Sequence, residues 1–142
     1  MRITVHRRLF TWILVVGLLS SCSTISPFNQ VAYEQATSLK VEALALMDKA
    51  TEPFANHQKD VDALMMKVDK AYEYAKGRPN NSDSTKQWAI IKDPSRNSLG
   101  GFLKRWEEKS TLSKTFITEA KGLVSDGFNT VIGLEGGKLK PN

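Results

Sequence analysis

The sequence predicts an all-α protein, a bundle of four to five helices that follows a short apolar N-terminal segment. Apolar residues recur at three- and four-residue steps from residue 28 onward, the spacing of one face of a helix. No strand-like alternation of apolar and polar residues is sustained, and no internal repeat is visible. Proline or glycine at 51–53, 77–79 and 136–137 divides the chain into helical segments.

The first two predicted helices have matching apolar faces. Ser26 is a good N-cap residue, and Pro27 suits the first position of a helix. The apolar residues of this helix are Phe28, Ala32, Ala36, Leu39, Ala43, Leu46 or Met47, and Ala50. Pro53 ends or kinks the helix, and heptad spacing then runs from Phe54 to Ala75. So short a connection favours an antiparallel hairpin, with one long kinked helix as the alternative.

The next segment predicts two shorter helices. Gly77-Arg78-Pro79 ends the second helix, and 80–83 is typical of an exposed turn. Residues 84–87 have the form of a capping box, with Trp88 and Ile91 expected to face inward. Asp93-Pro94 begins another helix or an irregular turn leading to one.

The last part of the chain predicts two buried helical faces. The first contains Leu99, Phe102, Leu103 and Trp106, and Gly100-Gly101 beside it indicates close backbone packing or a break. A final helix is expected from Ser110 or Thr111 to Gly136-Gly137, followed by a frayed tail over 138–142. Its expected apolar residues are Ile117, Ala120, Val124, Phe128 and Val131, broadened by Leu123, Ile132 and Leu134.

The first 21 residues have the layout of an export signal. Arg2, Arg7 and Arg8 precede an apolar run from Leu9 to Leu19, which is 11 residues long. A helix of that length rises roughly 16 Å, about half the hydrocarbon thickness of a bilayer. A basic start, a short apolar core and small residues after it are typical of a secretory signal.

The tetrad Leu19-Ser20-Ser21-Cys22 follows the apolar run directly. It resembles the lipobox of bacterial lipoproteins, in which an aliphatic residue and two small residues precede a cysteine. The resemblance implies a diacylated Cys22 (palmitate being a typical chain) that is cut free of residue 21 and often N-acylated. Two or more acyl chains hold a protein stably on a membrane. An uncleaved signal anchor is the alternative.

These observations predict three parts of the chain: a signal peptide over 1–21, a lipidated cysteine and short tether over 22–26, and a helical domain over 27–142. By resemblance to enterobacterial lipoproteins, Ser23 in place of aspartate implies the periplasmic face of the outer membrane. Because Cys22 is the only cysteine, an intramolecular disulfide is excluded, and acylation of its sulfur would also exclude a thiolate metal site.

The charge of the chain does not point to nucleic acid. Removal of residues 1–21 takes away three arginines and no acidic residue, so the formal charge falls from +5 to +2. Residues 79–142 keep a net charge of +3, with ten basic and seven acidic residues. This excess is either a solvated helical face or a basic face for an anionic leaflet.

No motif for catalysis or for a cofactor is recognisable, so we expect no enzyme, no cofactor and no metal site. His57 is the only histidine after the signal, and we expect it to be a packed or rim residue. Glu107 and Glu108 are adjacent carboxylates, but neighbours on a helix point about 100° apart. The Glu-Ser dipeptide of helical cell-wall lytic enzymes is absent.

The predicted function is therefore a non-catalytic adaptor in the bacterial cell envelope that binds an envelope protein. An amphipathic groove between the first two helices is a candidate site for a partner helix. The candidate contact residues are Tyr33, Met65, Lys67, Lys70 and Tyr74. Both tyrosines lie off the apolar faces of their helices, and only one of Met65 and Met66 can point fully inward. A leaflet-bound structural or exclusion factor is the alternative, followed by a cell-wall enzyme.

Overall fold

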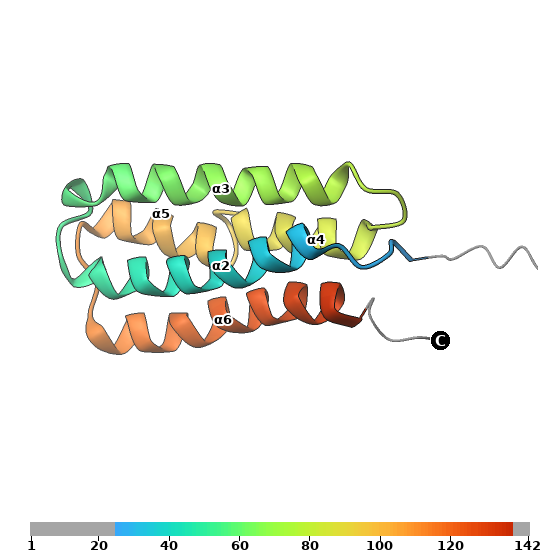
Figure 1. Cartoon of the computed structure of the whole chain (residues 1–142). Helices are drawn as coiled ribbons and strands as arrows, with labels where there is room; N and C mark the ends of the chain where they lie inside the picture. The colour runs from blue at the N-terminus through green and yellow to red at the C-terminus, as the bar shows by residue number, and fades with distance from the viewer. Residues whose placement is uncertain (1–24, 138–142) are drawn as a thin grey trace, which may run out of the picture.

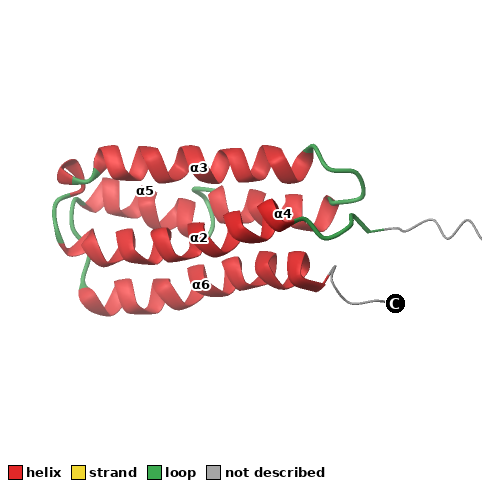
Figure 2. Cartoon of the chain, viewed as in Figure 1, coloured by secondary structure: helices red, strands yellow, loops and turns green. Residues whose placement is uncertain are grey.

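The computed structural model describes residues 25–137, which form five α-helices and, within that range, no strand. The helices are α2 (Gln30–Met47), α3 (Gln58–Lys76), α4 (Ser82–Lys92), α5 (Leu99–Lys109) and α6 (Lys114–Gly137). Two short 3₁₀ turns, Asp48–Thr51 and Phe54–Asn56, connect α2 to α3. The predicted all-α bundle is confirmed (Figure 2).

The five helices form four antiparallel rods, because α4 and α5 follow one another along the third rod (Figure 1). α2 packs against α3 and α6, and α4 packs against the same two helices from the other side. The α2–α3 pair is an antiparallel hairpin, so the kinked-helix alternative is wrong. The start of the described chain and the end of α6 lie at the same end of the bundle (Figure 1).

The apolar faces predicted for the helices meet in one core. Its buried members include Ala36, Leu39, Ala43, Met47, Val61, Leu64, Val68, Trp88, Ile91, Leu99, Phe102, Leu103, Trp106, Ile117, Val124, Phe128 and Val131. Leu123, predicted to broaden the face of α6, is instead 56% exposed. Ile132 packs against the core as predicted.

The start of α2 differs from the prediction. The helix begins at Gln30, and Asn29 caps it by accepting a hydrogen bond from the amide of Ala32 over 3.0 Å. Ser26 and Pro27 do not start the helix because their backbone groups are bonded elsewhere, to Asn80 and Arg78. The extended segment before α2 is therefore fixed to the bundle.

Two further helix starts also differ. α3 begins at Gln58 instead of at Phe54. Phe54 lies in the preceding 3₁₀ turn, and its amide donates to the carbonyl of Ser110. α4 begins at Ser82, two residues before the predicted cap. Asn81, expected in an exposed turn, is buried, and its side-chain amide donates to the carbonyl of Ala75 near the end of α3.

The last helix begins at Lys114, three to four residues later than the expected Ser110 or Thr111. The intervening residues bond to other parts of the bundle, because the carbonyl of Ser110 accepts from Phe54 and the amide of Leu112 donates to Ala50. Ser110 also has a positive φ of 64°, which a helix does not allow.

The connection between α4 and α5 is an irregular turn over 93–98 that packs tightly on the start of α5. A Cβ atom on Gly101 would lie 1.8 Å from the carbonyl oxygen of Arg96, and one on Gly100 would lie 2.3 Å from that of Lys92. The predicted close backbone packing at this glycine pair is therefore confirmed. Only glycine fits both positions.

We expect Gly101→Ala to lower the free energy of unfolding by about 3 kcal/mol, because the methyl group meets backbone that must shift. Gly122→Ala is the matched control, since this glycine lies within α6 with nothing in 4 Å of its Cβ position. Alanine there is expected to add about 1 kcal/mol through helix propensity. Urea unfolding measures both, and equal effects would contradict the packing argument.

Candidate functional site

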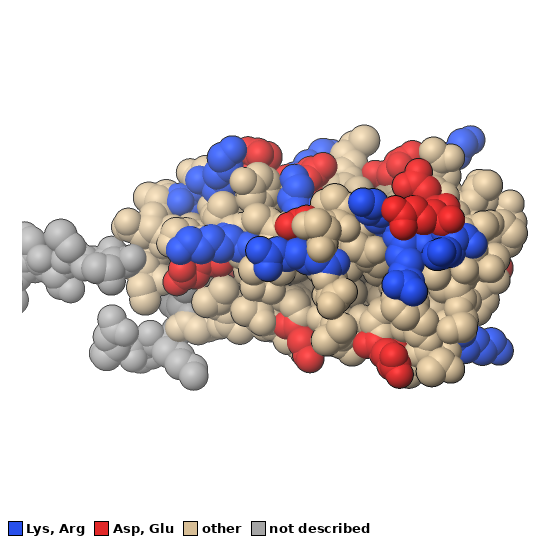
Figure 3. All heavy atoms as spheres, turned by 180° about the vertical axis from the view of Figure 1, so that it is seen from behind, with Lys and Arg blue, Asp and Glu red and all other residues tan. Residues whose placement is uncertain are grey.

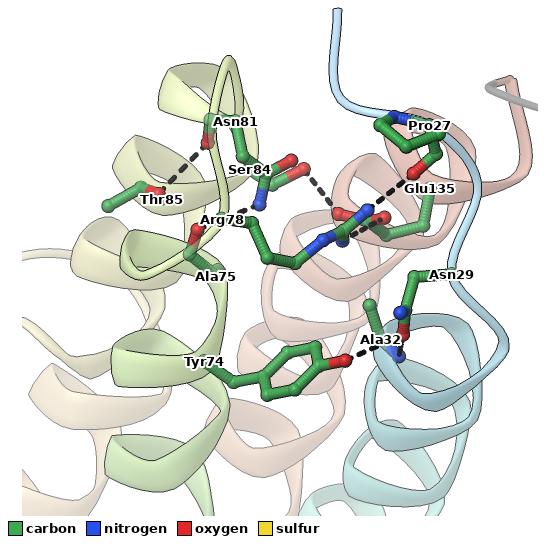
Figure 4. A network of polar contacts seen from close by, with 10 residues as sticks. All are labelled: Pro27, Asn29, Ala32, Tyr74, Ala75, Arg78, Asn81, Ser84, Thr85 and Glu135. Carbon is green, nitrogen blue, oxygen red and sulfur yellow. Dashed lines mark hydrogen bonds and ion pairs between the residues drawn. The ribbon is translucent and has the colours of Figure 1, made fainter.

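A partly buried polar cluster fastens the segment before α2 to the bundle (Figure 4). The amide of Ser26 donates to the carbonyl of Asn80 over 3.0 Å, and the guanidinium of Arg78 donates to the carbonyl of Pro27 over 2.5 Å. Ser26 is only 2% exposed. We call this cluster, Ser26, Pro27, Arg78, Asn80, Ser84 and Glu135, the clamp, and the end of the bundle that contains it the tether end.

Glu135 is the centre of the clamp. Its carboxylate is 1% exposed, although it is an ionisable group within α6. One oxygen accepts from the hydroxyl of Ser84 over 2.6 Å, and the other accepts from Arg78 over 3.0 Å. Both partners bind the charged form of the carboxylate, so its burial is compensated. Glu135 thereby joins α6 to α4 and to the α3–α4 turn, and Arg78 in turn binds the N-terminal segment.

The two predicted contact tyrosines lie near this end and are engaged within the chain. The hydroxyl of Tyr74 donates to the side-chain oxygen of Asn29 over 3.0 Å, which joins α3 to the cap of α2 (Figure 4). The ring of Tyr33 lies 6.2 Å from that of Phe28 and approaches Gly136 on α6. Tyr33 is half-buried and Tyr74 is exposed at its edge.

The other three predicted contact residues lie on α3. Met65 packs against the core, whereas Met66 is 59% exposed. Lys67 and Lys70 line a shallow hollow of about 330 Å³ between α2 and α3. Lys67 pairs with Glu42 across this hollow over 2.7 Å. The structure thus brings together the two lysines of the predicted groove, but Met65 and the tyrosines do not line it.

A larger groove, which the sequence did not indicate, lies between α5 and α6. Its volume is about 540 Å³, and it extends from the 94–98 turn along both helices. Phe102 and Phe116 stack with their ring centres 6.1 Å apart and line it together with Val124 and the exposed Leu123. It exists because α5 packs on α4 and on the Phe54–Asn56 turn, while α6 packs on α2 and α4.

Charged side chains surround this apolar floor. Arg105 lies over the ring of Phe116, 4.6 Å from its centre, in a cation–π arrangement. Arg96, Lys104, Glu108 and Glu119 also line the groove. At its edge, hydrogen bonds from the hydroxyl and amide of Ser95, with help from Arg96, lower the pKa of Asp93. The groove therefore offers apolar surface between three cations and two carboxylates.

The basic excess predicted for the second half lies along the α4–α5 rod. Figure 3 shows Lys and Arg side chains in a row across this face, with Asp and Glu grouped beside them toward the α5 end. Lys86, Lys92, Arg96 and Lys104 each pair with a carboxylate, on Asp83, Asp69, Asp93 and Glu108 respectively. Much of the row is thus compensated within the chain, as expected of a solvated helical face.

His57 lies at the opposite end of the bundle from the clamp. Its Nε2 is 2.7 Å from the carboxylate of Glu52, and its ring tilts against Trp106 with centres 5.5 Å apart. Its side chain is 13% exposed, so it is packed, as the sequence predicts. Among residues 25–137, no three His, Cys, Asp or Glu side chains lie close enough to hold a metal ion.

Cys22 and the predicted signal peptide lie outside the described residues, so the signal and the lipidation stay predictions. Within residues 25–137, every helix is too short or too polar to cross a bilayer. The chain matches no protein-family model, no curated protein and no solved structure.

The clamp is the polar site that sequence reasoning missed, although a signal was present. Glu135 continues the buried α6 series of Phe128 and Val131 at helical spacing, and Ser84 similarly precedes Trp88 and Ile91. A polar residue on an otherwise apolar face indicates a buried hydrogen bond. The α5–α6 groove had no comparable signal, because the sequence does not show how far apart two helices pack.

We expect Glu135→Ala to lower the free energy of unfolding by about 3 kcal/mol, because Arg78 and Ser84 lose a buried partner. Glu42→Ala, which removes the exposed pair with Lys67, should cost less than about 1 kcal/mol. Chemical denaturation compares them. The double change Arg78→Met with Glu135→Leu should recover most of the loss, because no unpaired charge stays buried. Equal costs for Glu135→Ala and Glu42→Ala would contradict the assignment.

Proposed function

We propose that this chain is a lipid-anchored, non-catalytic protein-binding module of the bacterial cell envelope. The observation that carries the binding role is the groove between α5 and α6, with its apolar floor and charged rim. The lipid anchor is supported by the lipobox-like tetrad that ends at Cys22.

The groove suits a protein segment. An amphipathic helix places apolar residues at three- and four-residue steps into such a groove and keeps polar residues at the rim. Leu123 and Phe116 supply apolar contact area, and Arg105 presents a guanidinium whose planar face is already supported by Phe116. Arginine and aromatic side chains are enriched where protein interfaces gain most of their binding energy.

The α5–α6 groove is a better candidate than the α2–α3 face. The hollow between α2 and α3 is smaller, and the ion pair of Lys67 with Glu42 crosses it. Two of the contact residues expected there, Met65 and Tyr74, take part in the packing of the bundle itself. Substitution of either residue would therefore alter folding as well as binding.

The anchor is tested by metabolic labelling with a clickable palmitate analogue. We expect the wild-type chain to carry the label and to fractionate with membranes, because Cys22 is the acceptor. Cys22→Ala should carry no label and should stay unprocessed, since the signal peptidase of lipoproteins acts on the acylated precursor. Equal labelling of both chains would contradict the proposal.

The binding role is tested by a photoreactive amino acid placed at position 123 in living cells. We expect a defined adduct with one envelope protein, because Leu123 is over half exposed within the groove. Arg105→Glu should weaken this adduct about tenfold, the effect expected of a central interface residue.

Matched positions make this result specific. Val41 is 68% exposed on α2, and Val31 is 47% exposed and lines the α2–α3 hollow, so both should accept the photoreactive residue without harm. An adduct at 31 but not at 123 would favour the α2–α3 face. Equal adducts at 41 and 123 would show that contact is unspecific and would contradict the groove.

A further inference from the structure

The tether end of the bundle has surface features that suit a lipid leaflet. We propose that this end binds anionic phospholipid headgroups, with Lys76 and Lys86 on the phosphates and with Ile25 and Leu134 at the apolar boundary. The inference rests on the proposed lipid anchor at Cys22, and it concerns a different surface from the α5–α6 groove.

The clamp determines which end faces the membrane. The amide of Ser26 and the carbonyl of Pro27 are both bonded to the α3–α4 turn, so the chain that leads back to Cys22 leaves the bundle there. The four residues from Cys22 to Ser26 span at most about 14 Å when fully extended. A lipid on Cys22 therefore keeps this end within reach of the headgroups.

A polar hollow of about 570 Å³ opens at this end. Lys76, Arg78 and Lys86 line it together with polar side chains from 80–82 and Thr85, and none of the described lining residues is acidic. Figure 3 shows Lys and Arg side chains close to the end where the described N- and C-terminal residues lie. The hollow places hydroxyl and amide groups between cations, and such groups are hydrogen-bond donors to a phosphate.

The two lysines can turn toward a phosphate. Lys76 lies 3.6 Å from Glu73 and Lys86 lies 3.7 Å from Asp83, and all four side chains are more than half exposed. Exposed pairs with such spacing contribute little, so little is lost when the ammonium groups change partner. Arg78 stays in the clamp, since its guanidinium holds Glu135 and Pro27.

A second, more apolar hollow of about 340 Å³ lies beside the 80–84 segment. Ile25, Gly133, Leu134 and Gly137 line it, together with one acidic residue, Asp83. Ile25 is 58% exposed, although it is a large aliphatic residue. Apolar side chains next to lysines are typical of surfaces that lie at the boundary between headgroups and acyl chains.

Lysine footprinting of the full, acylated chain in vesicles tests the proposal. An amine-reactive reagent is applied to protein in phosphatidylcholine vesicles with or without phosphatidylglycerol, and mass spectrometry measures modification at each lysine. We expect Lys76 and Lys86 to react about fivefold more slowly in the anionic vesicles. Lys104 is the internal control, because its 54% exposure matches the 56% of Lys76 and it lies on α5.

A charge reversal checks that the lysines act together. Lys86→Glu should remove most of the lipid-dependent protection of Lys76, whereas Lys104→Glu should leave it unchanged. Reaction rates at 76 and 86 that do not depend on lipid charge would overturn the proposal, as would equal protection at 104.

The source of the phosphate and the role of the anchor are distinguished separately. If inorganic phosphate protects Lys76 and Lys86 in phosphatidylcholine vesicles better than chloride of equal ionic strength, the hollow binds free phosphate and the lipid proposal fails. If the chain washes off the vesicles because Cys22 carries no acyl chain, the proposed anchor and this inference both fail. Protection by inorganic phosphate would not change crosslinking at position 123, so the proposed binding role of the groove would still stand.

Discussion

The arrangement of the tether end depends on the hydrogen bonds that the buried carboxylate of Glu135 accepts from Arg78 and Ser84. Helical propensity and apolar faces form the individual rods, but they do not determine how the extended N-terminal segment meets the bundle. Glu135 binds Ser84 and one nitrogen of Arg78. Arg78 donates from its second nitrogen to the carbonyl of Pro27, and this bond holds the N-terminal segment. A charge with almost no exposure is stable only with such partners, so α4, α6 and the α3–α4 turn must come together around Glu135.

The glycine pair at the start of α5 determines the arrangement of the third rod. Gly100 and Gly101 let the 93–98 turn lie directly on the helix, which places α5 as a separate helix in line with α4. An unbroken third helix would continue the packing of α4 along the rest of α6. The break instead leaves α6 partly uncovered over its first half, and the groove with the exposed Leu123 follows from this geometry.

The sequence predicts the helices well because burial of one apolar face is the dominant force in a bundle of this size. It predicts their ends less well, since the ends depend on partners far away in the sequence. Bonds to Asn80 and Arg78 keep Ser26 and Pro27 out of α2, and a bond to Ser110 keeps Phe54 out of α3. Tyr33 and Tyr74 are predicted contact residues because they lie off the apolar faces of their helices. That criterion does not distinguish a free tyrosine from Tyr74, which bonds to Asn29 across 45 residues of sequence.

The length of α6 has a consequence for the proposed function. Leu123 lies 14 residues before Gly137, the last described residue at the tether end, a distance of about 20 Å along a helix. With the proposed lipid anchor at Cys22 and its short tether, this length would separate the groove from the leaflet. Under the proposed function, the bundle would then act as a spacer for partners whose binding segment lies away from the membrane surface.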